Sequence, residues 1–66
     1  MKNNEQNNYI ISLIKHRNKL SAQIIKTKRA IELLGDNESI ISYLASITYT
    51  RELLDSEITS ESAKLA

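Results

Sequence analysis

Aliphatic side chains recur along the first half of the chain at alternating steps of three and four residues. This spacing follows one face of an α-helix and does not fit the two-residue alternation of a strand. The series consists of Ile10, Leu13, Arg17, Leu20, Ile24, Thr27, Ile31 and Leu34. Side chains on the opposite side are mostly polar, so the segment has one face to bury. The pattern predicts an amphipathic helix over about residues 5–34.

The second half of the chain repeats this spacing. Its series consists of Ile40, Leu44, Ile47, Arg51, Leu54, Ile58, Glu61 and Leu65. The residues after position 60 are mostly small or polar, and we expect the last turns to fray. The pattern therefore predicts a second helix over about residues 37–60, with flexible tails at both ends of the chain.

A turn separates the two series. Gly35 is the only glycine, and glycine enters the left-handed conformation that ends many helices without a Cβ penalty. Asp36 and Asn37 follow, and both residue types accept hydrogen bonds from the free N–H groups that begin a helix. Glu38 suits the positive end of the next helix dipole. These residues predict a turn at 35–37.

Two long helices with so short a connection must fold back on each other, which predicts an all-α antiparallel two-helix hairpin forming one domain over residues 1–66. Each helix of such a hairpin buries only one stripe, and the chain has no cysteine to form a disulfide. We therefore expect the hairpin to dimerise into a four-helix bundle or to be completed by a partner protein.

Charge differs between the two halves. Residues 1–34 carry seven basic and two acidic side chains, a net charge of +5, whereas residues 35–66 carry two basic and six acidic ones, a net charge of −4. Folding at the turn places numbers that sum to about 71 opposite each other. The register predicts three inter-helix ion pairs: Arg17 with Asp55, Lys19 with Glu52, and Lys15 with Glu57.

Two arginines, Arg17 and Arg51, interrupt the aliphatic stripes, one in each helix. A charge in a helix seam is costly unless it is paired, so these residues are candidates for setting the register, with Asp55 as a partner. The alternative is that each arginine lays its aliphatic stem on the seam and extends its guanidinium group to water or to Asp55.

Several apolar residues lie outside the two stripes and are candidates for binding a partner protein. Ile11, Ile14 and Ile25 widen the stripe of the first helix beyond what one facing helix can cover. Tyr49 and Leu53 lie four residues apart on the back of the second helix. Exposed apolar patches often mark interaction surfaces.

The sequence provides little for chemistry. The single glycine excludes a glycine-rich phosphate loop, and His16 has neither cysteine nor a second histidine to share a metal ion. Ser42 and Ser46 have no base beside them on the helix. We expect no enzyme, no cofactor and no metal. The apolar segment at 9–14 is too short for a signal peptide or a membrane span, which indicates a cytoplasmic protein.

Two functions remain open. The first is a small protein–protein interaction module that acts as adaptor, co-chaperone or stoichiometric inhibitor or regulator. The alternative is a dimeric bundle that binds RNA or DNA through the basic face of the first helix, which consists of Lys15, Lys19, Lys26 and Arg29. In length and hairpin layout, residues 5–58 resemble both the plasmid copy-number regulators that bind RNA as paired hairpins and the helical-hairpin co-chaperones of type III secretion needle subunits.

Overall fold

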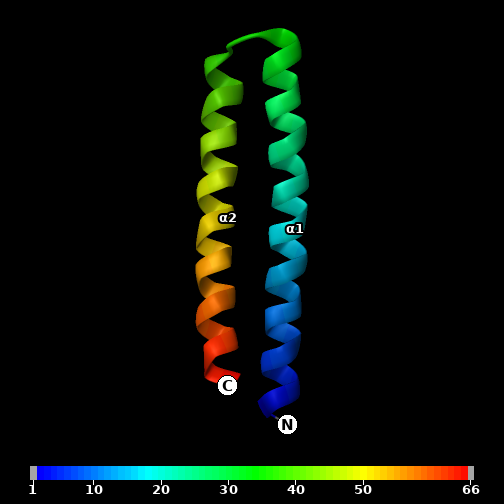
Figure 1. The fold of residues 1–66 in the computed structure, drawn as a ribbon, viewed down its shortest axis with the longest axis vertical. Helices are drawn as coiled ribbons and strands as arrows, with labels where there is room; N and C mark the ends of the chain where they lie inside the picture. The colour runs from blue at the N-terminus through cyan, green and yellow to red at the C-terminus, as the bar shows by residue number, and fades with distance from the viewer. Residues whose placement is uncertain (1, 66) are drawn as a thin grey trace.

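The computed structural model describes residues 2–65, with side chains from residue 5 onward. Helix α1 (Lys2–Leu34) and helix α2 (Glu38–Leu65) lie side by side and antiparallel, joined at one end, with both termini at the other end (Figure 1). The Cα atoms span 50 × 15 × 14 Å, so the molecule is one helix pair thick along its whole length. The predicted all-α antiparallel hairpin is confirmed.

The first helix ends at the glycine. Gly35 has a φ of 83°, and its N–H donates a hydrogen bond to the carbonyl oxygen of Ile31 at 2.8 Å. This is the left-handed helix cap in which one backbone bond satisfies a carbonyl of the last turn. The conformation requires glycine here because an L side chain at this φ is strained even where space is open.

The second helix begins with an asparagine cap. The Oδ1 atom of Asn37 accepts hydrogen bonds from the backbone N–H groups of Ser39 at 3.0 Å and Ile40 at 3.2 Å. Two of the free donors at the start of α2 are thereby satisfied. Of the two capping candidates in the turn, Asn37 therefore caps the helix, and Asp36 lies in the connection.

Both helices extend further than the sequence pattern indicates. Helix α1 begins at Lys2 rather than near residue 5, and α2 continues to Leu65 rather than ending near residue 60. The open end has contacts of its own, because Gln6 and Asn7 of α1 lie beside Lys64 and Leu65 of α2, and Lys64 forms an ion pair with Glu61 at 2.7 Å. The segments that we expected as tails are thus helical, apart from residues 1 and 66, which lie outside the described residues.

The core is a single narrow seam between the helices. Its central cluster consists of Leu20, Ile24 and Ile47, with Leu44 and Leu54 packed against it. The buried Thr27 hydroxyl donates to the carbonyl oxygen of Gln23 at 2.6 Å, so this polar group in the seam is satisfied. Among the described residues, no large side chain is completely buried. The hairpin alone therefore shields its apolar side chains only in part.

Leu34 does not lie in the seam, contrary to its place in the first aliphatic series. Its side chain is 74% exposed. Because α2 begins only at Glu38, no helical turn lies opposite the last residue of α1. The seam at the closed end instead finishes with Ile31 and Ile40, which are half-buried.

Candidate interaction surfaces

One long face of the hairpin is bridged by polar contacts. It contains the residues that directly precede the seam residues in each helix. The Tyr9 hydroxyl donates to Glu57 at 2.9 Å, and the Tyr43 hydroxyl donates to Oε1 of Gln23 at 3.4 Å. Both bonds cross from one helix to the other. We call this surface, defined by Tyr9, Gln23, Tyr43 and Glu57, the tyrosine face.

The opposite face carries exposed aliphatic side chains. Each residue advances the same way around a helix, so residues that follow the seam positions of two antiparallel helices share one face of the hairpin. This isoleucine face is defined by Ile11, Ile14, Ile25 and Ile41. Ile11 is 48% exposed, Ile25 69% and Ile41 43%, whereas Ile14 is half-buried. The sequence pattern indicated the three isoleucines of α1 but not Ile41, which directly follows the seam residue Ile40.

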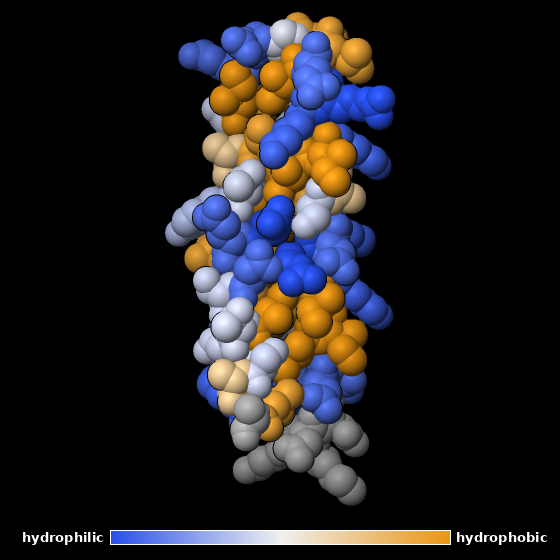
Figure 2. Space-filling model, in the orientation of Figure 1, coloured by the Kyte–Doolittle hydropathy of each residue, from blue (hydrophilic) through white to orange (hydrophobic). Residues whose placement is uncertain are grey.

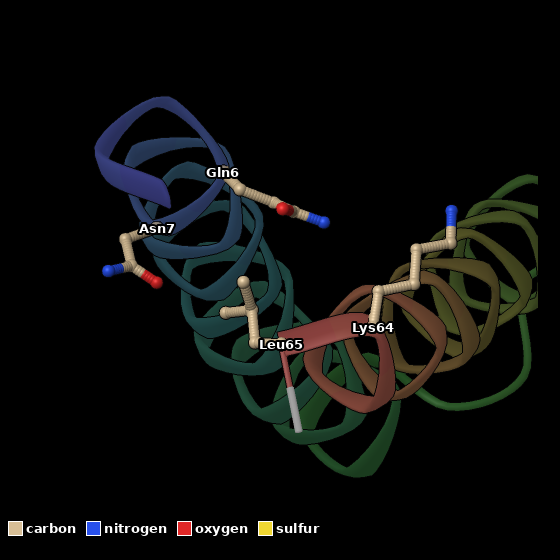
Figure 3. Close-up of a pocket in the computed structure, with 4 residues that line it drawn as sticks. All are labelled: Gln6, Asn7, Lys64 and Leu65. Carbon is tan, nitrogen blue, oxygen red and sulfur yellow. The ribbon is translucent and has the colours of Figure 1, made fainter. Parts of the chain in front are cut away.

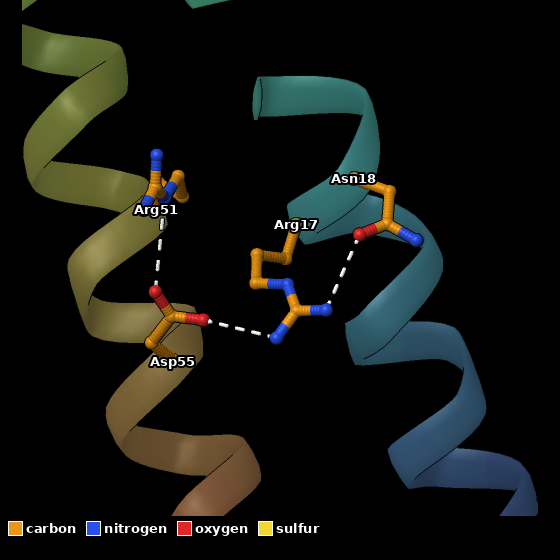
Figure 4. Close-up of polar contacts among 4 residues, drawn as sticks. All are labelled: Arg17, Asn18, Arg51 and Asp55. Atoms are coloured by element: carbon orange, nitrogen blue, oxygen red, sulfur yellow. Dashed lines mark hydrogen bonds and ion pairs between the residues drawn. The ribbon is translucent and has the colours of Figure 1, made fainter. Parts of the chain in front are cut away.

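Apolar side chains visible in the hydropathy view gather between the helices, above and below a polar belt at mid-height (Figure 2). Charged residues of the seam lie at this level. Nη1 of Arg17 lies 3.2 Å from Oδ1 of Asp55, and Nε of Arg51 lies 3.7 Å from Oδ2 of the same carboxylate. Arg17 also donates to Oδ1 of Asn18 at 3.3 Å (Figure 4). We call Arg17, Arg51 and Asp55 the charged belt.

The seam arginines are both paired with Asp55 and open to water. The Arg17 and Arg51 side chains are 32% and 42% exposed, so their guanidinium groups reach the surface while meeting a shared carboxylate. The other two predicted inter-helix pairs do not form. Among the described residues, neither Lys19 with Glu52 nor Lys15 with Glu57 makes an ion pair, and the Glu57 carboxylate accepts from tyrosine instead.

Two further surfaces lie on the outer sides of the helices. Tyr49 and Leu53 are 63% and 52% exposed on the side of α2 that faces away from α1. On α1, the predicted basic stripe is exposed, and none of its members takes part in an ion pair within the described part of the chain. Its members are Lys15, Lys19, Lys26 and Arg29.

Two shallow depressions lie among the described residues. One lies at the open end, where Gln6 and Asn7 of α1 meet Lys64 and Leu65 of α2 (Figure 3). Its lining is mostly polar. The other lies on α1 alone, and its lining residues are Ile25, Lys28, Arg29 and Glu32. Neither depression brings together a nucleophile and a base.

Two ionisable groups near the open end have perturbed pKa values. The pKa of Tyr9 is raised above its usual 10.0, chiefly because its hydroxyl donates to Glu57, whose negative charge also opposes formation of a tyrosinate. The pKa of Lys64 is raised because its ammonium group lies 2.7 Å from the Glu61 carboxylate. Both shifts favour the ordinary neutral-pH forms, a protonated phenol and an ammonium ion, so neither group is activated as a base.

Within the described residues, no group of three or more histidine, aspartate or glutamate side chains is arranged to hold a metal ion. Over the same part of the chain, neither helix has an apolar stretch long enough to cross a membrane. Comparison with known proteins finds no matching family model, no matching curated protein and no matching solved structure.

Proposed function

We propose that this hairpin is a non-enzymatic module that acts by binding proteins. The observation that carries the proposal is the isoleucine face, on which aliphatic side chains remain exposed on both helices. In water this surface is unfavourable, and its burial against apolar side chains of another protein would stabilise a complex by about 25 cal/mol per Å² of apolar area covered. An amphipathic helical surface of this kind suits packing against other helices.

The thinness of the hairpin supports this proposal. Its core is one seam, and a hairpin of this length gains stability when further helices cover its open face. We propose that these helices come from a second copy, forming a four-helix bundle, or from a foreign protein. The outer surface of α2, with Tyr49 and Leu53, provides a second place for a partner. An adaptor, co-chaperone or stoichiometric inhibitor would use such surfaces without any catalytic group.

Site-specific photo-crosslinking in the native cell tests the proposal. A photoreactive side chain is placed at Ile25 or at Tyr49, and at Lys19 on the basic stripe as the control. We expect protein adducts from the first two positions, with each adduct recurring on defined residues of its partner, and none from the third. Adducts spread at random over abundant proteins, or equal yields from all three positions, would contradict the proposal.

The basic stripe of α1 supports a second candidate function, the binding of RNA or DNA. Its cations are exposed and form no ion pair among the described residues, so they are free to contact phosphates. Exchanging Lys15, Lys19 and Lys26 together for Glu would abolish nucleic-acid binding, and binding by the unmodified chain would weaken steeply with salt. Under the protein-binding proposal, the same triple variant keeps its crosslinks at Ile25 and Tyr49.

A further inference from the structure

The depression on α1 has the geometry of a helix-packing hole. Its lining residues Ile25, Lys28, Arg29 and Glu32 are spaced at i, i+3, i+4 and i+7. Four residues with this spacing surround the hole that receives one side chain, the knob, of a neighbouring helix in knobs-into-holes packing. All four residues are exposed and lie one or two positions after a seam residue, so the hole opens away from α2 of the same chain.

The isoleucine face also carries a side chain suited to be the knob. Ile41 is 43% exposed on α2. The core contact between Ile24 and Ile47 and the ion pair between Arg17 and Asp55 fix which residues of the two helices lie at the same height. In this register, Ile41 of α2 lies at the height of the α1 segment between Arg29 and Glu32, which is part of the hole. Hole and knob thus occur at one height on one face of the hairpin.

Two symmetric arrangements can bring two such faces together. A two-fold axis parallel to the hairpin places α2 of the second copy over α1 of the first. This rotation does not shift residues along the helices, so Ile41 of each copy meets the hole of the other. An axis across the hairpin places α1 over α1. Helix α1 carries seven basic and two acidic side chains, and α2 carries two basic and five acidic ones. Only the parallel axis places helices of opposite net charge in contact.

We propose that a second copy of this chain docks on the isoleucine face about a two-fold axis parallel to the hairpin, with Ile41 of each copy filling the hole around Lys28 of the other. The inference rests on the proposed function, because it names the protein that covers this face. In the resulting four-helix bundle, every pair of neighbouring helices is antiparallel, as in up-and-down bundles. Ala45 lies one turn from Ile41 and meets Ile25 of the other copy, where its small side chain allows close approach.

Sedimentation equilibrium of the full chain tests whether Ile41 contributes to the dimer interface. We expect a dimer at micromolar concentration for the unmodified chain, and an association at least about tenfold weaker for Ile41→Lys, which sets a cation against Lys28 and Arg29 of the hole. Leu53→Lys makes the same change on the outer side of α2, and we expect it to leave the dimer intact. A monomeric unmodified chain, or a dimer weakened by Leu53→Lys and not by Ile41→Lys, would overturn the inference.

Disulfide trapping tests the orientation without depending on stability. The chain has no cysteine, so Ile25→Cys and Ala45→Cys can be made in separate preparations and mixed under mild oxidation. We expect disulfides between the two variants in excess over disulfides within either preparation. Predominant Ile25→Cys homodimers would show α1 against α1 and overturn this geometry. A dimer that forms no mixed disulfide also overturns this geometry. It does not overturn the proposed protein-binding function, which the photo-crosslinking experiment tests separately.

Discussion

Asp55 is the residue on which the charged belt depends. Its two oxygens face Arg17 of the opposite helix and Arg51 of its own helix, at 3.2 and 3.7 Å. All three side chains are partly open to water, and ion pairs of this kind contribute about 0–1 kcal/mol each. The carboxylate therefore adds modestly to stability, and its larger effect is to relieve the repulsion between two guanidinium groups at one level of the seam.

Replacing Asp55 by Asn should lower the free energy of unfolding by about 1 kcal/mol, because two neighbouring cations lose their shared anion. Urea unfolding followed by circular dichroism, at one fixed protein concentration, measures the change. Glu52→Gln is the matched control, since Glu52 is acidic, exposed and without an ion pair within the described residues. An equal loss in both variants would show that net charge, and not the belt, is responsible.

The hydroxyl of Tyr9 should titrate at higher pH than an ordinary tyrosine. Its pKa in the folded chain lies above the ordinary value of 10.0, so its bond to Glu57 stabilises the fold fully below about pH 10 and is lost as the pH rises through the folded pKa. Absorbance of tyrosinate, compared between the unmodified chain and Tyr9→Phe, isolates this group. Glu57→Gln should move its titration to lower pH, whereas Glu52→Gln should leave it in place. An unchanged titration in Glu57→Gln would refute the assignment.

At the scale of the helices, the ends are determined by single residues in the connection. The Asn37 side chain satisfies two backbone donors of α2, and the Asp36 side chain forms no hydrogen bond to the start of that helix. Asn37→Ala should therefore lower the free energy of unfolding by about 1 kcal/mol, the usual value of an N-cap. Asp36→Ala should have little effect in the same urea titration. The reverse order would show that Asp36 caps the helix in solution.

The helices also show what the sequence could and could not determine. Periodicity identified the seam through Leu20, Ile24 and Ile47, because the helical spacing of apolar residues is a local property of each segment. It misplaced Leu34, whose burial depends on where the opposite helix begins. It also placed the end of α2 too early, because the neighbours of Lys64 and Leu65 are Gln6 and Asn7, at the other end of the chain.

The sequence likewise predicts some features of the candidate surfaces and not others. Exposed positions such as Ile25 and Tyr49 follow from their offset to the aliphatic stripe. The ion-pair partner of a long charged side chain cannot be predicted from this offset, because flexible lysines such as Lys15 and Lys19 have many conformations of similar free energy. Ile41 was not predicted as a surface residue of interest, because its relation to the depression on α1 depends on how the two helices pack.

Across the whole molecule, a polar belt at mid-height divides the apolar surface between the helices into two parts (Figure 2), and Arg17 and Arg51 of the charged belt lie near the middle of α1 and α2. An uninterrupted seam of Leu and Ile can slide by one turn with little loss of contact. A seam with Arg17, Arg51 and Asp55 at one level cannot, because sliding would bury charges away from their partners. We therefore expect the belt to select one alignment of the helices, at some cost in stability.

Removing the belt should therefore stabilise the hairpin and weaken its alignment. In the variant Arg17→Leu, Arg51→Leu, Asp55→Thr, two seam positions become aliphatic, and the third copies Thr48, seven residues earlier on the same side of α2. Burial of the two leucines outweighs the lost ion pairs, and the free energy of unfolding should rise by about 1–4 kcal/mol. Urea unfolding measures this gain, with Lys26→Leu on the outer side of α1 as the control.

The loss of alignment has its own measurement. Backbone amide NMR spectra of the unmodified chain should show one set of resonances, and the belt variant should show additional sets or broadened seam signals, because several registers become similar in free energy. Disulfide trapping between Leu13→Cys and Ile58→Cys, which the native register places opposite each other, should likewise become less efficient. A more stable variant that keeps one sharp set of resonances would show that turn and core already fix the register, leaving the belt only a cost.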